Sequence, residues 1–293
     1  MPNFGKLTHC TLTGVDEKTD LPELIDLSVE HPIAEWGFLY SPKRQGQPGR
    51  YPSVGFLRKS FHELPLHVRV ALHICGSGVL QLIEGEPVVT ELVQLVGQRG
   101  GRIQLNFSAH AISNFTLDRV RDCIQRFPLI EFITQYNEAN VHVWKSLCDV
   151  PNHSVLFDAS GGRGIAADAW SAPLDGVRCG YAGGLGPQNM ALELQEIQTV
   201  AGDAPFWIDM EGKLRDGADW FDVGACKTTL EGLATVALID SGESEAVSDT
   251  GHKWEMRTVH TQRCIYCGAM VNDFQDCPGR SSERYRDKCK SSP

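Results

Sequence analysis

Eight short runs of apolar and β-branched residues recur along the chain, and longer amphipathic stretches separate them. Continuous apolar runs of this length are typical of strands buried on both faces, and helix-length spacers between them indicate βαβ units. The runs are Leu7–Thr11, Trp36–Tyr40, Val68–Ile74, Arg102–Asn106, Glu131–Gln135, Ser154–Asp158, Val177–Tyr181 and Phe206–Asp209. Two of the spacers carry helix start signals, Asp20-Leu-Pro and Pro187-Gln-Asn.

A (β/α)8 TIM barrel has eight parallel strands, each followed by a helix, which is the number of strands predicted here. A doubly wound α/β sheet shows the same alternation, but it usually has fewer strands. Its dinucleotide-binding form also needs a Gly-x-Gly-x-x-Gly turn after the first strand, and none follows Leu7–Thr11. The pattern therefore predicts an α/β fold, a (β/α)8 TIM barrel.

The composition changes after the last of these segments. Residues 241–250 form an acidic stretch rich in Gly and Ser, which is typical of a linker. The residues beyond it hold a cluster of cysteines and several Arg and Lys residues. We therefore predict a barrel domain over residues 1–238, a linker over 239–251 and a Cys-rich tail module over 252–293.

Composition and charge narrow the function classes. The chain has 293 residues and is 42% hydrophobic, which suits a folded globular protein. Its 27 basic and 37 acidic residues give a formal net charge of −10, which argues against nucleic-acid binding. No apolar run is long enough to span a bilayer, so no membrane association is predicted. The N-terminal residues lack the apolar core of a secretory signal, so the predicted compartment is the cytoplasm.

Four of the ten cysteines crowd the C-terminal segment: Cys264, Cys267, Cys277 and Cys289. A Cys-x-x-Cys-Gly knuckle followed by two further cysteines resembles a small zinc ribbon, in which thiolates bind Zn²⁺ tetrahedrally. We predict a structural zinc ion there, with His252 and His260 as alternative ligands; free thiols or a redox pair are the other interpretations. The appended module suggests a protein partner for the tail.

Polar residues at the predicted strand ends are the candidates for chemistry, because TIM-barrel active sites lie where strands end and βα loops begin. A thiolate with a lowered pKa can remove a carbon-bound proton, and a protonated carboxyl can donate one. Cys10 and Asp158 offer such a base and acid at two strand ends. The further candidates to line the mouth are Arg50, His73, Cys75, Gln104, Asn106, Gln135, Asn137, Asp209 and Glu211.

Two glycine-rich loops point to an anionic ligand. Ser160-Gly-Gly-Arg-Gly164 follows the sixth run, and Ala182-Gly-Gly-Leu-Gly-Pro-Gln-Asn189 follows the seventh and leads into a predicted helix. Glycines let backbone N–H groups approach a ligand, and a helix N-terminus favours negative charge. Gly162, Arg163, Gly164, Gly183 and Gly184 are therefore predicted to bind a small anion, phosphosugar or nucleotide-like.

Several segments, in this order, resemble phosphoribosylanthranilate isomerase. Cys10 followed by Thr-Leu-Thr13 is similar to the family's first-strand Cys-Gly-Leu-Thr, and Ala182–Asn189 is similar to its Ala-Gly-Gly-Leu-x-Pro-x-Asn phosphate loop. The other matches are Gly37-Phe-Leu-Tyr-Ser-Pro42, Gly49-Arg-Tyr51, Gln104-Leu105 and Phe157-Asp158 with Gly161-Gly-Arg-Gly164.

The resemblance implies an Amadori rearrangement of an N-(5-phosphoribosyl)anthranilate-like substrate. Cys10 would be the general base and Asp158 the general acid. Arg50 would hold a substrate carboxylate, and the two glycine-rich loops would hold phosphate. The reaction needs no cofactor.

The chain also departs from the family. Glu211 replaces a Ser-Ser-Gly-like phosphate motif, Thr11 replaces the glycine after the cysteine, and the tail has no counterpart. A carboxylate at position 211 would repel a phosphate unless Lys213 or Arg163 offsets it. A divergent isomerase is the leading hypothesis. One alternative is a non-catalytic barrel that binds or sequesters the ligand; the other is a lyase or aldolase, for which Lys213 and Lys227 are poor Schiff-base candidates because both follow the eighth strand.

Overall fold

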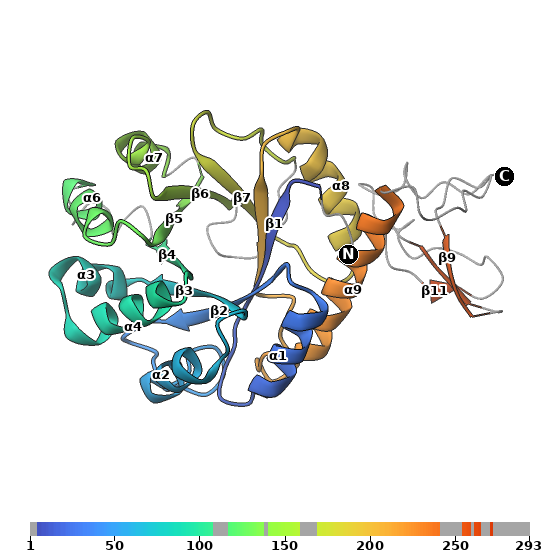
Figure 1. Ribbon diagram of the computed structural model, residues 1–293, viewed down its shortest axis with the longest axis horizontal. Coiled ribbons are helices and arrows are strands. Elements are labelled where there is room, and N and C mark those ends of the chain that lie inside the picture. Colours follow the sequence, from blue (N-terminus) through green and yellow to red (C-terminus); the bar gives the residue numbers. More distant parts are fainter. Residues whose placement is uncertain are drawn as a thin grey trace.

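The computed structural model describes residues 5–107, 117–137, 140–158 and 169–240, together with three short strands between residues 254 and 271. Eight parallel strands form a closed barrel in sequence order, and β8 pairs with β1 (Figure 1). The strands are β1 (Leu7–Thr13), β2 (Ala34–Tyr40), β3 (Arg69–Cys75), β4 (Arg102–Asn106), β5 (Glu131–Tyr136), β6 (His153–Asp158), β7 (Arg178–Ala182) and β8 (Phe206–Met210). The predicted TIM barrel is therefore confirmed.

Helices lie outside the strands, around the barrel (Figure 1). Asp20 is the N-cap of the first helix, which has a proline in its first turn, and Asn189 is the N-cap of the helix after β7, so both predicted helix starts are present. The described helices are α1 (Leu21–Glu30), α2 (Val54–Glu63), α3 (Ser77–Glu84), α4 (Pro87–Gln98), α6 (Leu117–Gln125), α7 (Val141–Leu147), α8 (Met190–Ala201) and α9 (Val223–Asp240). The last helix ends two residues beyond the predicted domain limit at 238.

Successive side chains of β1 point to opposite faces of the barrel wall, as in any strand. Thr11 and Thr13 point inward: the hydroxyl of Thr11 donates to Glu35 (2.8 Å) and that of Thr13 donates to Asp209 (2.9 Å). Cys10 and Leu12 therefore point outward, where they belong to the apolar core between strands and helices. This alternation decides which side chains of β1 point into the interior of the barrel.

A buried ion pair fills the interior of the barrel near the beginnings of β2 and β4. The guanidinium of Arg102 donates to both carboxylate oxygens of Glu35 (2.6 and 2.9 Å) and lies over the indole of Trp207, 4.8 Å from the ring centroid. Both charged side chains are almost completely buried. The hydrogen bonds hold β2 to β4 across the lumen and close the barrel from below.

Gly180 on β7 provides the space for Trp207. A Cβ atom at position 180 would lie 2.1 Å from the indole, which no real contact allows. We expect Gly180→Ala to lower the free energy of unfolding by about 1–3 kcal/mol, the usual effect of overpacking a filled core. Urea unfolding followed by tryptophan fluorescence measures it. The control is Gly212→Ala, since a Cβ atom at position 212 meets nothing within 4 Å. Gly46 also has open space around it, but its φ of +79° would strain an alanine. Equal stability of Gly180→Ala and wild type would contradict this packing.

The C-terminal segment contains a small antiparallel sheet with the order β11-β10-β9. Its strands are β9 (Trp254–Thr258), β10 (Thr261–Cys264) and β11 (Met270–Val271). Cys264 ends β10, whereas Cys267, Cys277, Cys289 and both candidate histidines lie outside the described residues. Within the described residues, no group of three or more His, Cys, Asp or Glu side chains could hold a metal ion. The zinc ligand set in the tail stays a prediction.

Over the same described part of the chain, no helix combines the length and the apolar character needed to cross a bilayer.

Candidate active site

A cavity of about 320 Å³ opens at the carboxyl end of the barrel strands. Its wall combines carboxylates, carboxamides and cations with a glycine-rich loop. The lining residues are Arg50, His73, Gln104, Asn106, Gln135, Leu156, Asp158, Ala182, Gly183, Gly184, Leu185, Asp209, Met210, Glu211, Gly212 and Lys213. Strands β3, β4, β5, β6, β7 and β8 and the loops after β2, β7 and β8 all contribute to it.

Most of the predicted site residues meet in this one cavity. Ten of them line it: Arg50, His73, Gln104, Asn106, Gln135, Asp158, Gly183, Gly184, Asp209 and Glu211. Gly162, Arg163 and Gly164 lie outside the described residues.

Cys10 does not reach the cavity, and the expectation that its thiol faces the barrel mouth is wrong. Its side chain is fully buried on the outer face of β1, near Cys226 of α9. Burial raises the pKa of the Cys10 thiol far above its usual value, and Asp209 and Glu35 raise it further. An outward-facing thiol that stays protonated cannot remove a proton from a ligand in the lumen.

Asp158 ends β6 and faces the cavity as predicted. Its side chain is almost completely buried, and the carboxamide of Gln135 on β5 donates to its Oδ2 atom (2.9 Å). This hydrogen bond fixes the orientation of the carboxyl group. In the sheet register, Asp158 pairs with Ala182 and Ala182 pairs with Asp209, so the two aspartates are separated only by β7, and both line the cavity.

Asp209 is the second carboxyl group of the cavity. Its Oδ1 atom accepts a hydrogen bond from the Thr13 hydroxyl, and its Oδ2 atom lies 3.9 Å from Nε2 of His73. Burial raises its pKa to about 7, partly opposed by the Thr13 hydrogen bond; Glu35 and Asp158 raise it and Arg102 lowers it. A carboxyl group with such a pKa exchanges protons readily near neutral pH.

His73 lies on β3 and is buried at the inner wall of the cavity. Its Nε2 atom has no hydrogen-bond partner among the described residues. Burial lowers the pKa of the imidazole to about 4, although Glu211 and Glu35 act in the opposite direction, while Arg102 lowers it further. The ring is therefore neutral at physiological pH. The sequence placed His73 at the mouth but gave no role for it, because the aspartate beside it is 136 residues away along the chain.

Asp209 gives the protein a testable dependence on pH. Its folded-state pKa is raised, so its contribution to stability is present below the unfolded pKa of about 3.9 and is lost as the pH rises through 7. We expect Asp209→Asn to be more stable than wild type at pH 8.5, by up to about 4 kcal/mol, and by only about 1.5 kcal/mol at pH 5. Urea unfolding at the two pH values measures the difference. A variant less stable than wild type at pH 8.5 would contradict the raised pKa.

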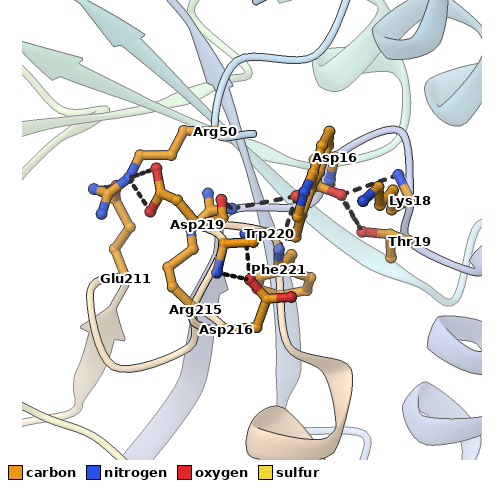
Figure 2. Close-up of polar contacts among 11 residues, drawn as sticks. Asp16, Lys18, Thr19, Arg50, Glu211, Arg215, Asp216, Asp219, Trp220 and Phe221 are labelled. Carbon is orange, nitrogen blue, oxygen red and sulfur yellow. Dashed lines mark hydrogen bonds and ion pairs between the residues drawn. The ribbon is translucent and has the colours of Figure 1, made fainter. Parts of the chain in front are cut away.

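Arg50 lines the cavity, but it already binds two carboxylates (Figure 2). Its Nη1 atom donates to Glu211 (2.7 Å), and its Nε atom donates to both oxygens of Asp219 (3.0 Å each). These ion pairs join the loop after β2 to the loop after β8. The positive charge at Arg50 also offsets the carboxylate of Glu211 beside the cavity.

A second ion pair holds the loop after β8 to the loop after β1 (Figure 2). The buried carboxylate of Asp16 accepts from Arg215 (3.2 Å) and from the backbone N–H of Phe221 (2.8 Å). Asp216 caps the turn by accepting from the N–H groups of Ala218 and Trp220. These contacts fix the loop and thereby the position of Glu211.

The glycine-rich loop after β7 lines the cavity beside the loop after β8. Gly183 and Gly184 have φ angles of +113° and +66°, which favour glycine. The side chain of Asn189 accepts from the Gly186 N–H (2.9 Å) and donates to the Gly184 carbonyl (3.1 Å), so it holds the loop in shape. A Cβ at Gly186 would lie 2.5 Å from Lys213, so this loop packs closely against the loop after β8.

Comparisons with known proteins support the same fold. No protein-family model matches the sequence, and no curated protein sequence does either. Among solved structures, a monomeric form of phosphoribosylanthranilate isomerase from Thermotoga maritima is 19% identical, with a TM-score of 0.52 over 78% of this chain and 99% of that one. The Thermus thermophilus enzyme is 17% identical, with a TM-score of 0.52 over 78% and 99%. TrpF from Jonesia denitrificans is 15% identical, with a TM-score of 0.52 over 81% and 100%. The chain therefore shares the barrel fold of the phosphoribosylanthranilate isomerases, as its sequence motifs predict.

Proposed function

We propose that this protein is an isomerase that catalyses an Amadori-type rearrangement of an anionic phosphoribosyl compound. The observation that carries the proposal is the pair of buried carboxyl groups, Asp158 and Asp209, that line the same cavity. An aldose-to-ketose rearrangement needs one group to protonate the ring oxygen and another to move a proton between carbons. Two carboxyls in different surroundings suit those two tasks.

Asp158 is the proposed general acid, as the sequence motif implies. Asp209 takes the role of base that the sequence assigned to Cys10, because its carboxyl faces the cavity and its pKa is about 7. Gln135 and Thr13 orient the two groups by hydrogen bonds. Acid–base groups placed in this way typically contribute about 10²–10⁴-fold each.

The anionic part of the substrate is proposed to bind near Lys213 and the loop that contains Gly183 and Gly184. Lys213 lines the cavity and packs against Gly186 of that loop. Because Arg50 lies 2.7 Å from Glu211, the repulsion between this carboxylate and a substrate phosphate is reduced. The rearrangement moves only protons and a ring bond, so no cofactor is proposed for the barrel.

The test is turnover of N-(5-phosphoribosyl)anthranilate by the purified full chain, followed by loss of anthranilate-type fluorescence. We expect turnover at neutral pH that the double variant Asp158→Asn/Asp209→Asn lacks. Absence of turnover from protein shown to be folded by circular dichroism would reject this substrate.

A ligand-binding protein without catalysis is the second candidate. It is favoured by the engagement of Arg50, whose guanidinium is shared between Glu211 and Asp219 rather than left open for a substrate carboxylate. Mass spectrometry of small molecules that copurify with the chain separates the two candidates. A tightly retained phosphosugar that is recovered unchanged would favour binding. A lyase or aldolase is disfavoured, since Lys213 at the cavity rim is exposed and a Schiff-base lysine is usually desolvated.

A further inference from the structure

Nε2 of His73 is a buried hydrogen-bonding atom at the cavity wall that the proposed acid–base pair does not use. The His73 side chain is only 3% exposed, and Nε2 has no hydrogen-bond partner among the described residues. A buried polar atom without a partner weakens a folded protein, by roughly 1–3 kcal/mol. Because His73 lines the cavity, a ligand that enters the cavity can supply the missing bond.

The neighbouring group defines what that ligand must offer. Oδ2 of Asp209 lies 3.9 Å from Nε2, which is too long for a direct hydrogen bond. A single oxygen atom can lie at about 2.8 Å from both atoms across a gap of this size. The other carboxylate oxygen of Asp209 is already bound to Thr13, so Oδ2 is the one that faces the gap.

The chemistry of the two flanking atoms favours a hydroxyl group. A neutral imidazole nitrogen without a proton accepts a hydrogen bond, and a carboxyl group donates or accepts one according to its protonation. A hydroxyl group can donate its proton to the imidazole nitrogen and, through its oxygen, accept a hydrogen bond from the protonated carboxyl of Asp209. A phosphate oxygen has no proton to donate at neutral pH, and the carboxylate would repel it.

We infer that His73 and Asp209 together bind a sugar hydroxyl, the one on the carbon that loses its proton, and that His73 accepts the hydroxyl proton during the rearrangement. The inference rests on the proposed function, since it assigns part of the substrate to this position. His73 is then a third catalytic residue, and the substrate must carry a free hydroxyl at C2.

The proton transfers balance with these three residues. Asp158 gives a proton to the ring oxygen as the bond from C1 to that oxygen breaks and a C1=N bond forms. The carboxylate of Asp209 then takes the C2 proton, the electron pair of that C–H bond forms a C1=C2 bond, and the C1=N pair returns to nitrogen. His73 takes the hydroxyl proton as C2=O forms, while C1 recovers the proton held by Asp209. The proton on His73 returns to Asp158 through solvent, which restores the starting state.

The test compares two ligands that differ only at the hydroxyl, ribose 5-phosphate and 2-deoxyribose 5-phosphate, by titration calorimetry with the full chain. We expect wild type to prefer ribose 5-phosphate about tenfold, the equivalent of one buried hydrogen bond. His73→Phe keeps a ring of similar size without nitrogen and should lose this preference. His73→Gln, which restores an acceptor oxygen, should recover part of it. The matched control is His62→Phe, an exposed histidine on α2, which should behave as wild type.

Equal affinity of wild type for the two sugars, or a preference that survives in His73→Phe, would overturn the inference. Failure of wild type to bind either sugar would overturn it as well. Turnover of N-(5-phosphoribosyl)anthranilate is measured separately. Turnover without a hydroxyl preference leaves the proposed function standing and removes only the role of His73. A hydroxyl preference without turnover keeps His73 as a hydroxyl-binding residue and overturns both the proposed function and the proton transfer to His73.

Discussion

Asp209→Asn is expected to lower kcat for the rearrangement by about 10²–10⁴-fold, with a smaller effect on KM. The amide keeps the size of the carboxyl group and can still accept the hydrogen bond from Thr13, but it cannot take the C2 proton. The loss should therefore appear in the chemical step. Steady-state kinetics with N-(5-phosphoribosyl)anthranilate from pH 5 to pH 9 measures it, and the wild-type rate should rise as Asp209 loses its proton near pH 7.

Cys10→Ala is the matched control for this result. Cys10 is the residue that the sequence motif designates as the base, but its thiol lies outside the lumen in the apolar core. The alanine variant should keep kcat within a few fold of wild type, since it removes a small buried side chain and no cavity group. Loss of activity in Cys10→Ala with full activity in Asp209→Asn would reverse our assignment of the base.

The largest stability effect is expected from the buried ion pair below the cavity. Arg102→Met leaves the carboxylate of Glu35 buried without its partner, and removing one partner of such a pair typically lowers the free energy of unfolding by about 3–5 kcal/mol. Arg102 also holds the pKa of Glu35 down, to about 2 despite full burial, so the carboxylate remains charged at neutral pH. Urea unfolding at pH 7 by circular dichroism measures the loss.

The double variant Arg102→Met/Glu35→Leu tests the cause. Replacing both charges with apolar side chains removes the unpaired carboxylate, so much of the stability lost in the single variant should return. A loss under about 1 kcal/mol in Arg102→Met would mean that Glu35 finds another partner or takes up a proton at little cost.

The apolar pattern was sufficient to predict the barrel, because the strands are buried on both faces and the spacers carry capping residues. All eight predicted strands are present, and their ends differ from the observed ones by at most two residues, as for Leu7–Thr11 against Leu7–Thr13. The sites at the strand ends follow from the fold, so the sequence is sufficient to place Asp158 and Asp209 at the mouth.

The motif match at Cys10 does not identify the base, because a sequence motif does not define the direction in which a side chain points. Strand side chains alternate, so a shift of one residue moves a group to the other face of the wall. In the resembling family a glycine follows the cysteine directly, whereas here the glycine at the end of β1 is Gly14, and it follows Thr13. Thr13 is the residue that faces the lumen at this level and bonds to Asp209. The bond from Thr11 to Glu35 identifies the inward positions of β1, but this contact between two strands exists only in the folded barrel.

The ion pairs around Arg50 and the gap between His73 and Asp209 could not be predicted from the sequence. Arg50 lies 161 residues from Glu211 along the chain, and no local pattern links them. Such contacts depend on the shape of two loops that meet only in the folded barrel.

The seam between β1 and β8 has a consequence for how the protein is made. The two strands pair from Leu7 with Phe206 to Leu12 with Met210, so the barrel cannot close until the eighth strand has been synthesised. Until then the nascent chain carries two unpaired strand edges, which are prone to pair with other chains. The Thr13–Asp209 and Asp16–Arg215 bonds cross the same seam. Ligand-binding competence should therefore appear last during synthesis, all at once, and a nascent chain released before residue 210 should be a client of chaperones rather than a weak enzyme.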